Sequence, residues 1–397
     1  MEQPAQAVSV PAPFIRVLPL NFTGNGYEYF RIWIVNLFLT VITLGIYSAW
    51  AKVRKLRYFY GNTWVDDNAF SYLGDPVKIL KGRIIAVGFV AIYSLAWNFF
   101  PDAAMAVLAL GVLAFPFFLV TAMSFQLRNS AYRNIRFFFN RDYREVYRIF
   151  IVPIAIVLLL TWLAYSMFDV TDLLTEAQKQ NDVEFNKADL LPSIFMLALM
   201  PVIPYLDYLR MRYIVNHTQY GKRKASFSAG GWDFYKVYLM TFLMFIVFMI
   251  IGIVIMTVCI AVIVGLTGGA DAKSIFRNAG VFIITMTIFY GLGIVVSGYM
   301  RARRTNIVYG STAFGEININ SKLKFLPVAW IYLSNVFAVL FSLGLLIPWT
   351  KIRMMRYVAG CTELESRDLG DVAQEEGIDP GALGQEMFDA FDLDIGL

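Results

Sequence analysis

Long uncharged stretches alternate with short charged ones along almost the whole chain. The uncharged stretches lie at residues 32–51, 84–101, 103–127, 149–168, 190–206, 237–270, 278–300 and 325–350. A helix needs about 20 mostly apolar residues to cross the hydrocarbon core of a bilayer. The pattern therefore predicts an all-α protein, a polytopic transmembrane helix bundle with six to eight spans.

The composition favours the same environment. Hydrophobic residues make up 58% of the 397 residues and charged residues only 16%, against about 25% charged residues in a typical soluble domain. A single soluble core of this length does not hide so many apolar side chains, so lipid is the natural solvent for the excess. The 2 cysteines and 1 histidine give no disulfide framework, and we expect no metal site and no cofactor.

Basic residues gather between the uncharged stretches. The basic clusters lie at residues 52–57, 78–83, 128–148, 210–236, 301–324 and 351–356. Lys and Arg concentrate on the cytoplasmic side of inner-membrane proteins, so we expect these loops to be cytoplasmic in a multi-pass protein of the bacterial inner membrane. The positive excess is then topological, and because it forms no separate basic domain we expect no nucleic-acid partner.

Charge also divides the chain into three parts. Residues 361–397 carry eleven acidic residues and one arginine. We therefore divide the chain into an N-terminal segment (1–29), a transmembrane helical domain (30–360) and an acidic C-terminal tail (361–397). The tail is a candidate binding site for a protein partner.

The first and last uncharged stretches conflict with the rule that places basic loops in the cytoplasm. Basic clusters flank residues 325–350 on both sides, so a full crossing would leave one cluster outside. Either the end stretches cross and break the rule locally, or they enter the bilayer and return. The second alternative is slightly favoured, although a re-entrant backbone must be buried against protein.

The two end stretches resemble each other at a constant offset of 299 residues. The matching pairs are Asn36 and Asn335, Leu44 and Leu343, Gly45 and Gly344, Trp50 and Trp349, Lys52 and Lys351, Arg54 and Arg353, and Arg57 and Arg356. So many matches at one offset predict an internal repeat. A looser pattern, an apolar span that ends in Arg followed by Asn, recurs between them. Ordinary positive-inside termination with an Asn cap is preferred over shared ancestry as its explanation.

Several short segments resemble a known family. FTGNGYEYFRIWIVN (22–36), TLGIYSAWAKVR (43–54), FSYLGDP (70–76) and KGR (81–83) are similar to the YjgN-like family of bacterial inner-membrane proteins. The resemblance implies a multi-pass inner-membrane location. It implies no activity, because the family is functionally uncharacterised, and it supplies no catalytic residues.

Few residues in the hydrophobic stretches could carry chemistry. Asn36 and Asn335 are polar positions within the end stretches; they could bind substrate or a lipid head group, but helix packing is the preferred interpretation. Asp207 is the deepest acid, and an ion pair with Arg210 three residues later, or snorkelling, explains it. Pro201 and Pro204 should kink their span, as in some transporter sites.

The basic residues of the end stretches could bind anionic lipid head groups. The candidates for this role are Lys52, Arg54, Arg57, Lys351, Arg353 and Arg356. Each basic residue near an anionic surface contributes about 1 kcal/mol to membrane attraction. Nearly any inner-membrane protein would share this property, so it does not indicate a specific function.

Three functions remain open from the sequence. A transporter or channel is favoured as the broadest description. A scaffold or envelope-assembly factor that binds lipid or other membrane proteins is the alternative, supported by the absence of charges in the middle of the spans. A lipid-modifying enzyme ranks last because no catalytic constellation is visible, and we expect no enzymatic activity.

Overall fold

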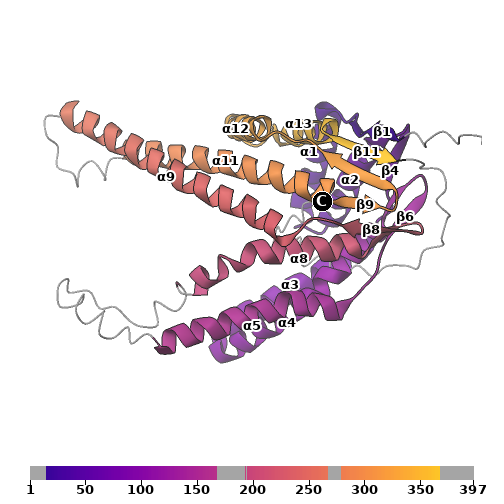
Figure 1. The fold of residues 1–397 in the computed structure, drawn as a ribbon, viewed down its shortest axis with the longest axis horizontal. Helices are drawn as coiled ribbons and strands as arrows, with labels where there is room; N and C mark the ends of the chain where they lie inside the picture. Colours follow the sequence, from indigo (N-terminus) through magenta and orange to yellow (C-terminus); the bar gives the residue numbers. More distant parts are fainter. Residues whose placement is uncertain (1–14, 168–192, 194, 267–278, 367–397) are drawn as a thin grey trace, which may run out of the picture.

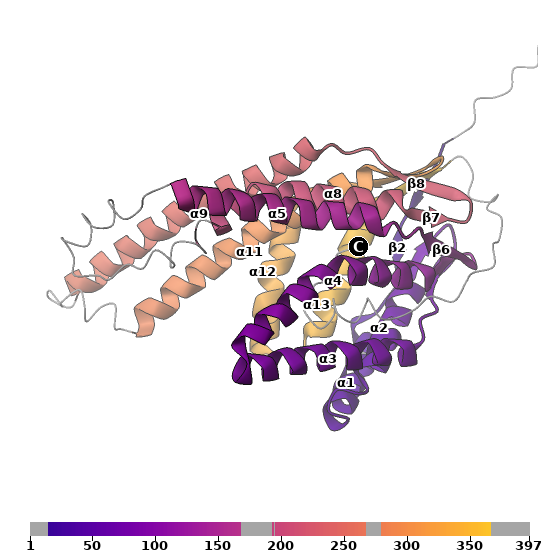
Figure 2. The same cartoon turned by 90° about the horizontal axis from the view of Figure 1, so that it is seen from below.

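A computed structural model describes residues 15–167, 193, 195–266 and 279–366 of the chain. The strands gather at one end of the molecule, and the long helices project away from them (Figure 1). The view from below shows the same separation, with helices from the whole length of the chain starting or ending near the strands (Figure 2). The fold is therefore organised around a set of strands that the helices leave and rejoin.

The helices of the described residues form five pairs, and in each pair one helix leaves the strands and the next returns to them. The helices are α1 (Gly26–Ile42), α2 (Ser48–Gly61), α3 (Pro76–Phe99), α4 (Pro101–Arg128), α5 (Tyr143–Met167), α8 (Val202–Asn216), α9 (Gly231–Leu266), α11 (Ala279–Gly310), α12 (Phe325–Phe341) and α13 (Ile347–Gly360). The pairs are α1/α2, α3/α4, α5/α8, α9/α11 and α12/α13, and the two helices of each pair pack together.

The strands in the described part of the chain form one antiparallel sheet of 11 strands. They are β1 (Arg16–Pro19), β2 (Asn21–Phe22), β3 (Thr63–Val65), β4 (Asn68–Tyr72), β5 (Ser130–Tyr132), β6 (Ile135–Phe139), β7 (Thr218–Tyr220), β8 (Arg223–Phe227), β9 (Thr312–Phe314), β10 (Ile317–Ser321) and β11 (Thr362–Ser366). Their order is β1-β11-β10-β9-β8-β7-β6-β5-β4-β3-β2.

The two edges of this sheet belong to a single extended segment. β1 pairs with β11, β2 pairs with β3, and only Leu20 separates β1 from β2. The Leu20 amide continues the pairing by donating to the Thr362 carbonyl at 3.0 Å. The sheet therefore closes on itself, and we call it the strand ring. Closure removes the exposed edges that an open sheet would present to other chains.

Four tight hairpins supply most of the ring. The β3/β4 turn places Asp66 and Asp67 at φ 45° and 55°, and the β5/β6 turn places Arg133 and Asn134 at φ 49° and 64°. The other two turns begin with glycine at positive φ, Gly221 and Gly315. Such two-residue turns match the twist of antiparallel strands.

The same backbone hydrogen bond fastens every helix pair to the ring. The residue that directly follows the strand before each outgoing helix donates its amide to the carbonyl of the residue that directly follows the returning helix. These bonds, at 2.7–3.0 Å, run from Thr23 to Asn62, Leu73 to Asn129, Asn140 to His217, Ser228 to Ser311 and Lys322 to Cys361. The five pairs are thus geometrically equivalent around the ring. The internal repeat predicted for the two end stretches stays a prediction.

The expectation of an all-α fold is wrong. The ring strands are two to five residues long, too short to give a hydrophobic period in a sequence dominated by long apolar helices. The strands β5 to β10 also fall in the basic segments that the sequence assigns to loops. In addition, β1 and β2 lie within the segment 1–29, and β11 lies within the acidic tail, so the two outer parts of the chain meet in the ring.

The end stretches return to the side from which they begin. Residues 43–47 and 342–346 are tight turns with matched left-handed conformations, φ 50° at Leu44 and 51° at Leu343, then 92° at Gly45 and 89° at Gly344. α1 and α2 both meet the ring, as do α12 and α13. The basic clusters on both sides of residues 325–350 therefore lie toward the ring, which removes the conflict with the charge rule.

The predicted number of six to eight spans is also wrong. Four helices of the described chain are long and apolar enough to cross a membrane: Pro76–Phe99, Pro101–Arg128, Tyr143–Leu163 and Gly231–Val262. The end stretches are divided by their turns, and Phe325–Phe341 is a shorter apolar helix. The stretches 190–206 and 278–300 include residues outside the description.

Substituting Gly26 by alanine should destabilise the protein. A Cβ at Gly26 would overlap the Trp349 indole where α1 meets α13, and a rigid ring cannot yield easily. Overpacking of this kind costs about 1–3 kcal/mol. The apparent unfolding temperature of the detergent-purified protein should fall in Gly26→Ala. Gly61→Ala is the matched control, because nothing lies near its added Cβ; an equal fall in both variants would contradict the packing.

Candidate functional site

The inner face of the strand ring carries one equivalent side chain from each of its five sectors. These residues are the third positions of β3, β5, β7, β9 and β11: Val65, Tyr132, Tyr220, Phe314 and Leu364. Side chains alternate between the two faces of a strand, so the first and third positions of each strand share a face. The register of the ring places these side chains around one central space.

The first positions of the same strands carry hydroxyl groups that are already used. Each hydroxyl donates to the carbonyl four residues earlier, at 2.6–2.8 Å: Thr63 to Phe59, Ser130 to Gln126, Thr218 to Ile214, Thr312 to Val308 and Thr362 to Val358. Each bond caps the end of a returning helix. The hydroxyls therefore contribute little polarity to the space inside the ring.

Two of the inward tyrosines link neighbouring sectors. The Tyr132 hydroxyl donates to the Val65 carbonyl at 2.8 Å, and the Tyr220 hydroxyl donates to the Tyr132 carbonyl at 3.1 Å. Burial, and then the neighbouring Tyr132, raise the pKa of Tyr220 to about 12, and burial also raises the pKa of Tyr132. Both phenols stay neutral at physiological pH.

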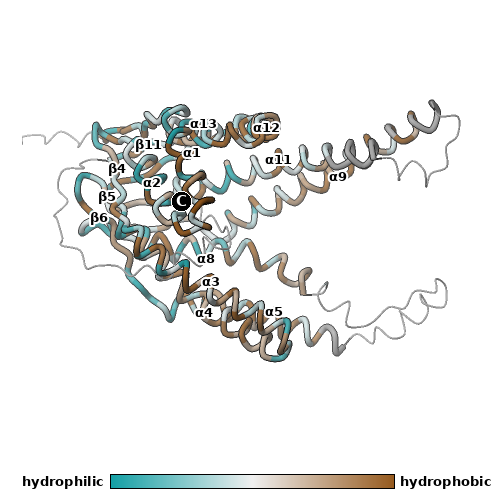
Figure 3. The backbone as a smooth tube through the Cα atoms, turned by 180° about the vertical axis from the view of Figure 1, so that it is seen from behind, coloured by the Kyte–Doolittle hydropathy of each residue, from teal (hydrophilic) through white to brown (hydrophobic). Residues whose placement is uncertain are grey.

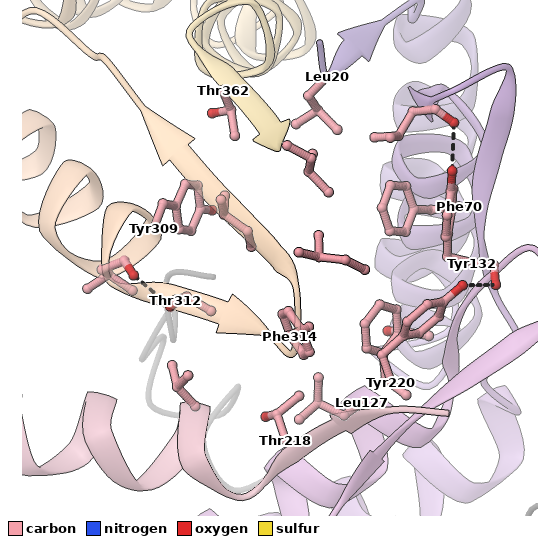
Figure 4. A pocket seen from close by; sticks show the side chains of 18 of the residues that line it. Leu20, Phe70, Leu127, Tyr132, Thr218, Tyr220, Tyr309, Thr312, Phe314 and Thr362 are labelled. Carbon is pink, nitrogen blue, oxygen red and sulfur yellow. Dashed lines mark hydrogen bonds between the residues drawn. The ribbon is translucent and has the colours of Figure 1, made fainter. Parts of the chain in front are cut away.

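These side chains surround a cavity of about 350 Å³. Figure 4 shows Tyr132, Tyr220 and Phe314 around it. Its lining residues come from all five sectors: Leu20, Tyr60, Val65, Phe70, Gln126, Leu127, Ser130, Tyr132, Phe137, Ile214, Val215, Thr218, Tyr220, Val308, Tyr309, Thr312, Phe314, Ile317, Ile319, Thr362 and Leu364. None of these described residues is charged. The volume falls within the range of about 300–1,000 Å³ typical of ligand sites.

The outer surfaces of the helices are apolar as well. Leu44 and Leu343, at the tips of the two short helix pairs, are 94% and 93% exposed, and Phe341 is 86% exposed. Hydrophobic segments dominate the helices, whereas hydrophilic segments lie around the strands (Figure 3). Exposed apolar surface on this scale requires a nonaqueous partner. The helices are therefore suited to lipid, and the cavity lies at their ring end.

The family model for bacterial proteins of unknown function termed DUF898 matches residues 17–390. The chain belongs to this family. It is 24% identical over 360 residues to "Inner membrane protein YjgN" of Salmonella typhimurium, covering 87% of this chain and 88% of that protein. It is 26% identical over 210 residues to the protein of the same name from Escherichia coli O157:H7, covering 50% of each chain. No solved structure matches this family member.

The comparisons confirm the resemblance to the YjgN-like family. The matched region extends from Val17 in β1 beyond β11, so it covers the strand ring except for Arg16. The relatives' name, together with the four apolar helices, supports an inner-membrane location for this chain.

Asp207 on α8 forms an ion pair with Arg304 on α11, which belongs to another helix pair. Arg304 on α11 donates from Nε to Asp207 Oδ2 at 2.7 Å and from Nη2 to Oδ1 at 2.8 Å. The Tyr238 hydroxyl donates to Oδ2 at 3.2 Å. The partner of Asp207 is thus Arg304, 97 residues away, rather than the predicted Arg210. The arrangement joins α8, α9 and α11 and lies outside the cavity lining.

The two asparagines of the end stretches lie in separate helix pairs. Asn36 on α1 is 7% exposed and its amide donates to the Ala51 carbonyl of α2 at 3.5 Å. Asn335 is half-buried on α12. Neither residue lines the cavity, so the structure does not bring them into one site.

The two prolines begin a helix. Pro201 directly precedes α8, and Pro204 is buried in its first turn. The Pro201 carbonyl accepts a hydrogen bond from the Tyr235 hydroxyl at 2.8 Å. Proline is well tolerated in a first helical turn, where the missing N–H has no intrahelical partner.

The basic candidates of the end stretches lie on α2 and α13. Arg57 and Arg356 occupy equivalent positions and donate to the carbonyls of Gly74 and Gly24, at 3.4 and 3.0 Å. Arg353 donates to Ser334 Oγ at 2.7 Å. Lys52 and Lys351 also have interaction partners, and Arg54 is exposed. Part of this basic set therefore fastens the two short helix pairs.

Sequence reasoning missed the cavity residues. The available signal was a Ser or Thr followed two residues later by a large apolar or aromatic residue, directly after each helix, as in Ser130-Ala-Tyr132 and Thr218-Gln-Tyr220. Each triplet is too short to predict a strand alone. The triplet predicts the strands of the ring only because it recurs in five places, four of which are followed by a two-residue turn.

Breaking the ion pair of Asp207 should destabilise the protein strongly. Asp207→Asn leaves Arg304, whose side chain is 17% exposed, without its counter-charge. Loss of one partner of a buried pair costs about 3–5 kcal/mol. Asp233→Asn is the control, because Asp233 and Lys236 form an exposed pair, 44% and 61% exposed, worth at most about 1 kcal/mol. Thermal unfolding in detergent should separate the two variants; equal unfolding temperatures would contradict the assignment.

Proposed function

We propose that this protein is a lipid-binding protein of the inner membrane that holds a hydrocarbon chain of a lipid in the cavity of the strand ring. The supporting observation is the chemistry of the lining. Aliphatic and aromatic side chains dominate it, and the hydroxyls of Ser130, Thr218, Thr312 and Thr362 already donate to helix carbonyls. An apolar cavity favours an apolar ligand, because water would find few polar partners there.

This chemistry narrows the broader prediction of a transporter or channel. An ion or polar solute must exchange its hydration shell for polar or charged protein groups, and the described lining offers no charged side chain. If the protein moves a molecule, that molecule is the apolar chain itself. We propose lipid binding without catalysis, since the described lining residues include no arrangement of nucleophile and base.

The position of the cavity also supports a lipid ligand. Its lining residues lie on the strands and at the ring ends of the helices, and the helices are more hydrophobic than the strand end (Figure 3). Basic side chains such as Arg54 lie on the returning helices, where they would attract anionic head groups. We propose that this end faces the cytoplasm, in agreement with the positive-inside rule. A protein partner for the acidic tail stays a separate prediction.

Filling the cavity should abolish retention of lipid. Val65 and Leu364 are the two aliphatic positions among five equivalent ones, whereas the other three carry Tyr or Phe. Val65→Tyr combined with Leu364→Tyr adds side chains that the ring already accommodates elsewhere. Wild-type protein purified in a mild detergent should carry about one lipid per chain by native mass spectrometry and lipid extraction, and the filled variant should carry markedly less.

The matched control changes the outer side of the same sheet. Val17 on β1 is 53% exposed, so Val17→Tyr adds the same group without entering the cavity and should retain lipid. Equal lipid content in the wild-type and filled proteins would contradict the proposal.

A truncated chain that ends at residue 366 tests whether the acidic tail competes with lipid for the cavity. A rise in bound lipid would identify the tail as a competitor. Loss of bound lipid would contradict the proposal that the cavity alone is sufficient to hold it.

A further inference from the structure

Three potential metal ligands meet where the α5/α8 pair joins the ring. Asp142 directly precedes α5, Glu145 lies in its first turn, and His217 directly follows α8. One ligand atom from each residue lies within 4.8 Å of the others. The side chains are partly buried, with His217 15% and Glu145 37% exposed. The cluster is separate from the apolar cavity, since none of the three lines it.

The histidine is held in the orientation that metal binding requires. His217 Nδ1 lies 2.9 Å from the Tyr213 carbonyl, and a carbonyl oxygen only accepts, so Nδ1 carries the hydrogen. Nε2 then points to Glu145, 3.5 Å from Oε2. In the neutral imidazole this nitrogen is an unprotonated acceptor that faces another acceptor. A backbone carbonyl that orients the distal nitrogen is the usual outer-shell arrangement of histidine ligands.

The equivalent helix pairs show that the fold does not require these residue types. In the α1/α2 pair the same positions hold Asn25, Glu28 and Asn62. The Asn62 amide donates to the Tyr58 carbonyl at 2.8 Å, the bond that His217 makes to Tyr213. Asn25 Oδ1 caps α1 by accepting from the Tyr27 amide at 2.9 Å, as Asp142 Oδ1 accepts from the Glu145 amide at 3.1 Å.

Asparagine therefore fulfils both capping roles in one pair, and the α5/α8 pair replaces it with two better metal ligands. Among the five pairs, the corresponding positions read Asn25, Glu28 and Asn62; Asp75, Lys78 and Asn129; Asp142, Glu145 and His217; Gly230, Asp233 and Ser311; and Lys324, Pro327 and Cys361. The third of these sets alone combines three ligands of the types that bind metals.

We propose that Asp142, Glu145 and His217 bind a divalent first-row transition-metal ion. One imidazole nitrogen with two carboxylates suits Zn²⁺ or Mn²⁺ better than Mg²⁺ or Ca²⁺, which prefer oxygen ligands alone. Ligands bonded at about 2.1 Å in a tetrahedral site are about 3.4 Å apart. The His217–Glu145 distance of 3.5 Å already meets this spacing, and rotation of the Asp142 carboxylate would complete the set. Solvent would supply the remaining ligand.

The test is direct Zn²⁺ binding to the full-length protein, purified through a tag without histidine. Isothermal titration with a competing chelator, together with metal analysis, should give one equivalent of Zn²⁺ per chain. His217→Asn and Asp142→Asn install the residues found at positions 62 and 25, so both should keep the unfolding temperature of the metal-free protein. Their affinity for Zn²⁺ should fall by at least about 100-fold, since loss of a direct ligand exceeds the 10–100-fold effect of outer-shell changes.

Two further variants make the result decisive. Glu145→Gln should weaken Zn²⁺ binding in the same way, and it replaces His217→Asn in the test if that variant does not fold. Asp233→Asn removes a carboxylate from the corresponding position of the α9/α11 pair and should bind Zn²⁺ as the wild type does. Equal Zn²⁺ uptake by the wild type and His217→Asn would overturn the proposal and identify adventitious binding. If the wild-type protein does not bind Zn²⁺, the cluster is only a histidine–carboxylate ion pair, and this result would also overturn the proposal.

Discussion

The pairing of residues 16–22 with two strands that are far apart in sequence is the constraint on which the fold depends. The first half of this segment pairs with β11 and the second half with β3, so one extended stretch closes a sheet that would otherwise have two free edges. Once the ring is closed, the five equivalent amide–carbonyl bonds fix where each helix pair starts and ends. The cavity exists because the inward side chains of all five sectors then face one another.

Much of the membrane character could be predicted from the sequence, and the ring could not. The long apolar stretches within α3, α4, α5 and α9 match helices that can cross a bilayer, because hydrophobic length alone decides that property. The strands were hidden because triplets such as Thr218-Gln-Tyr220 carry no periodic signal and adjoin basic residues. The reversals in the end stretches depend on Leu44 and Leu343 in left-handed conformations, which sequence preference disfavours for leucine.

Contacts between residues far apart in sequence could not be predicted for the candidate site either. Sequence proximity favoured Arg210 as the partner of Asp207, whereas the fold supplies Arg304 from another helix pair. His217 looked isolated because Asp142 and Glu145 reach it only after α5 and α8 fold together. In both cases the residue types were visible in the sequence, but the contacts arise from helices that the ring places side by side. The backbone arrangement is common to all five pairs, whereas the combination of Asp142, Glu145 and His217 occurs in one of them.

Ring closure can be measured directly by disulfide trapping in native membranes. Val17 lies opposite Glu365, and Asn21 lies opposite Trp64; directly paired residues are about 4.5–5.5 Å apart, within the range for a disulfide. With the native Cys259 and Cys361 replaced by serine, the pairs Val17→Cys/Glu365→Cys and Asn21→Cys/Trp64→Cys should both cross-link rapidly on mild oxidation, as detected by mass spectrometry of the linked peptides. Cross-linking of one pair without the other would show an open sheet and contradict the closed ring.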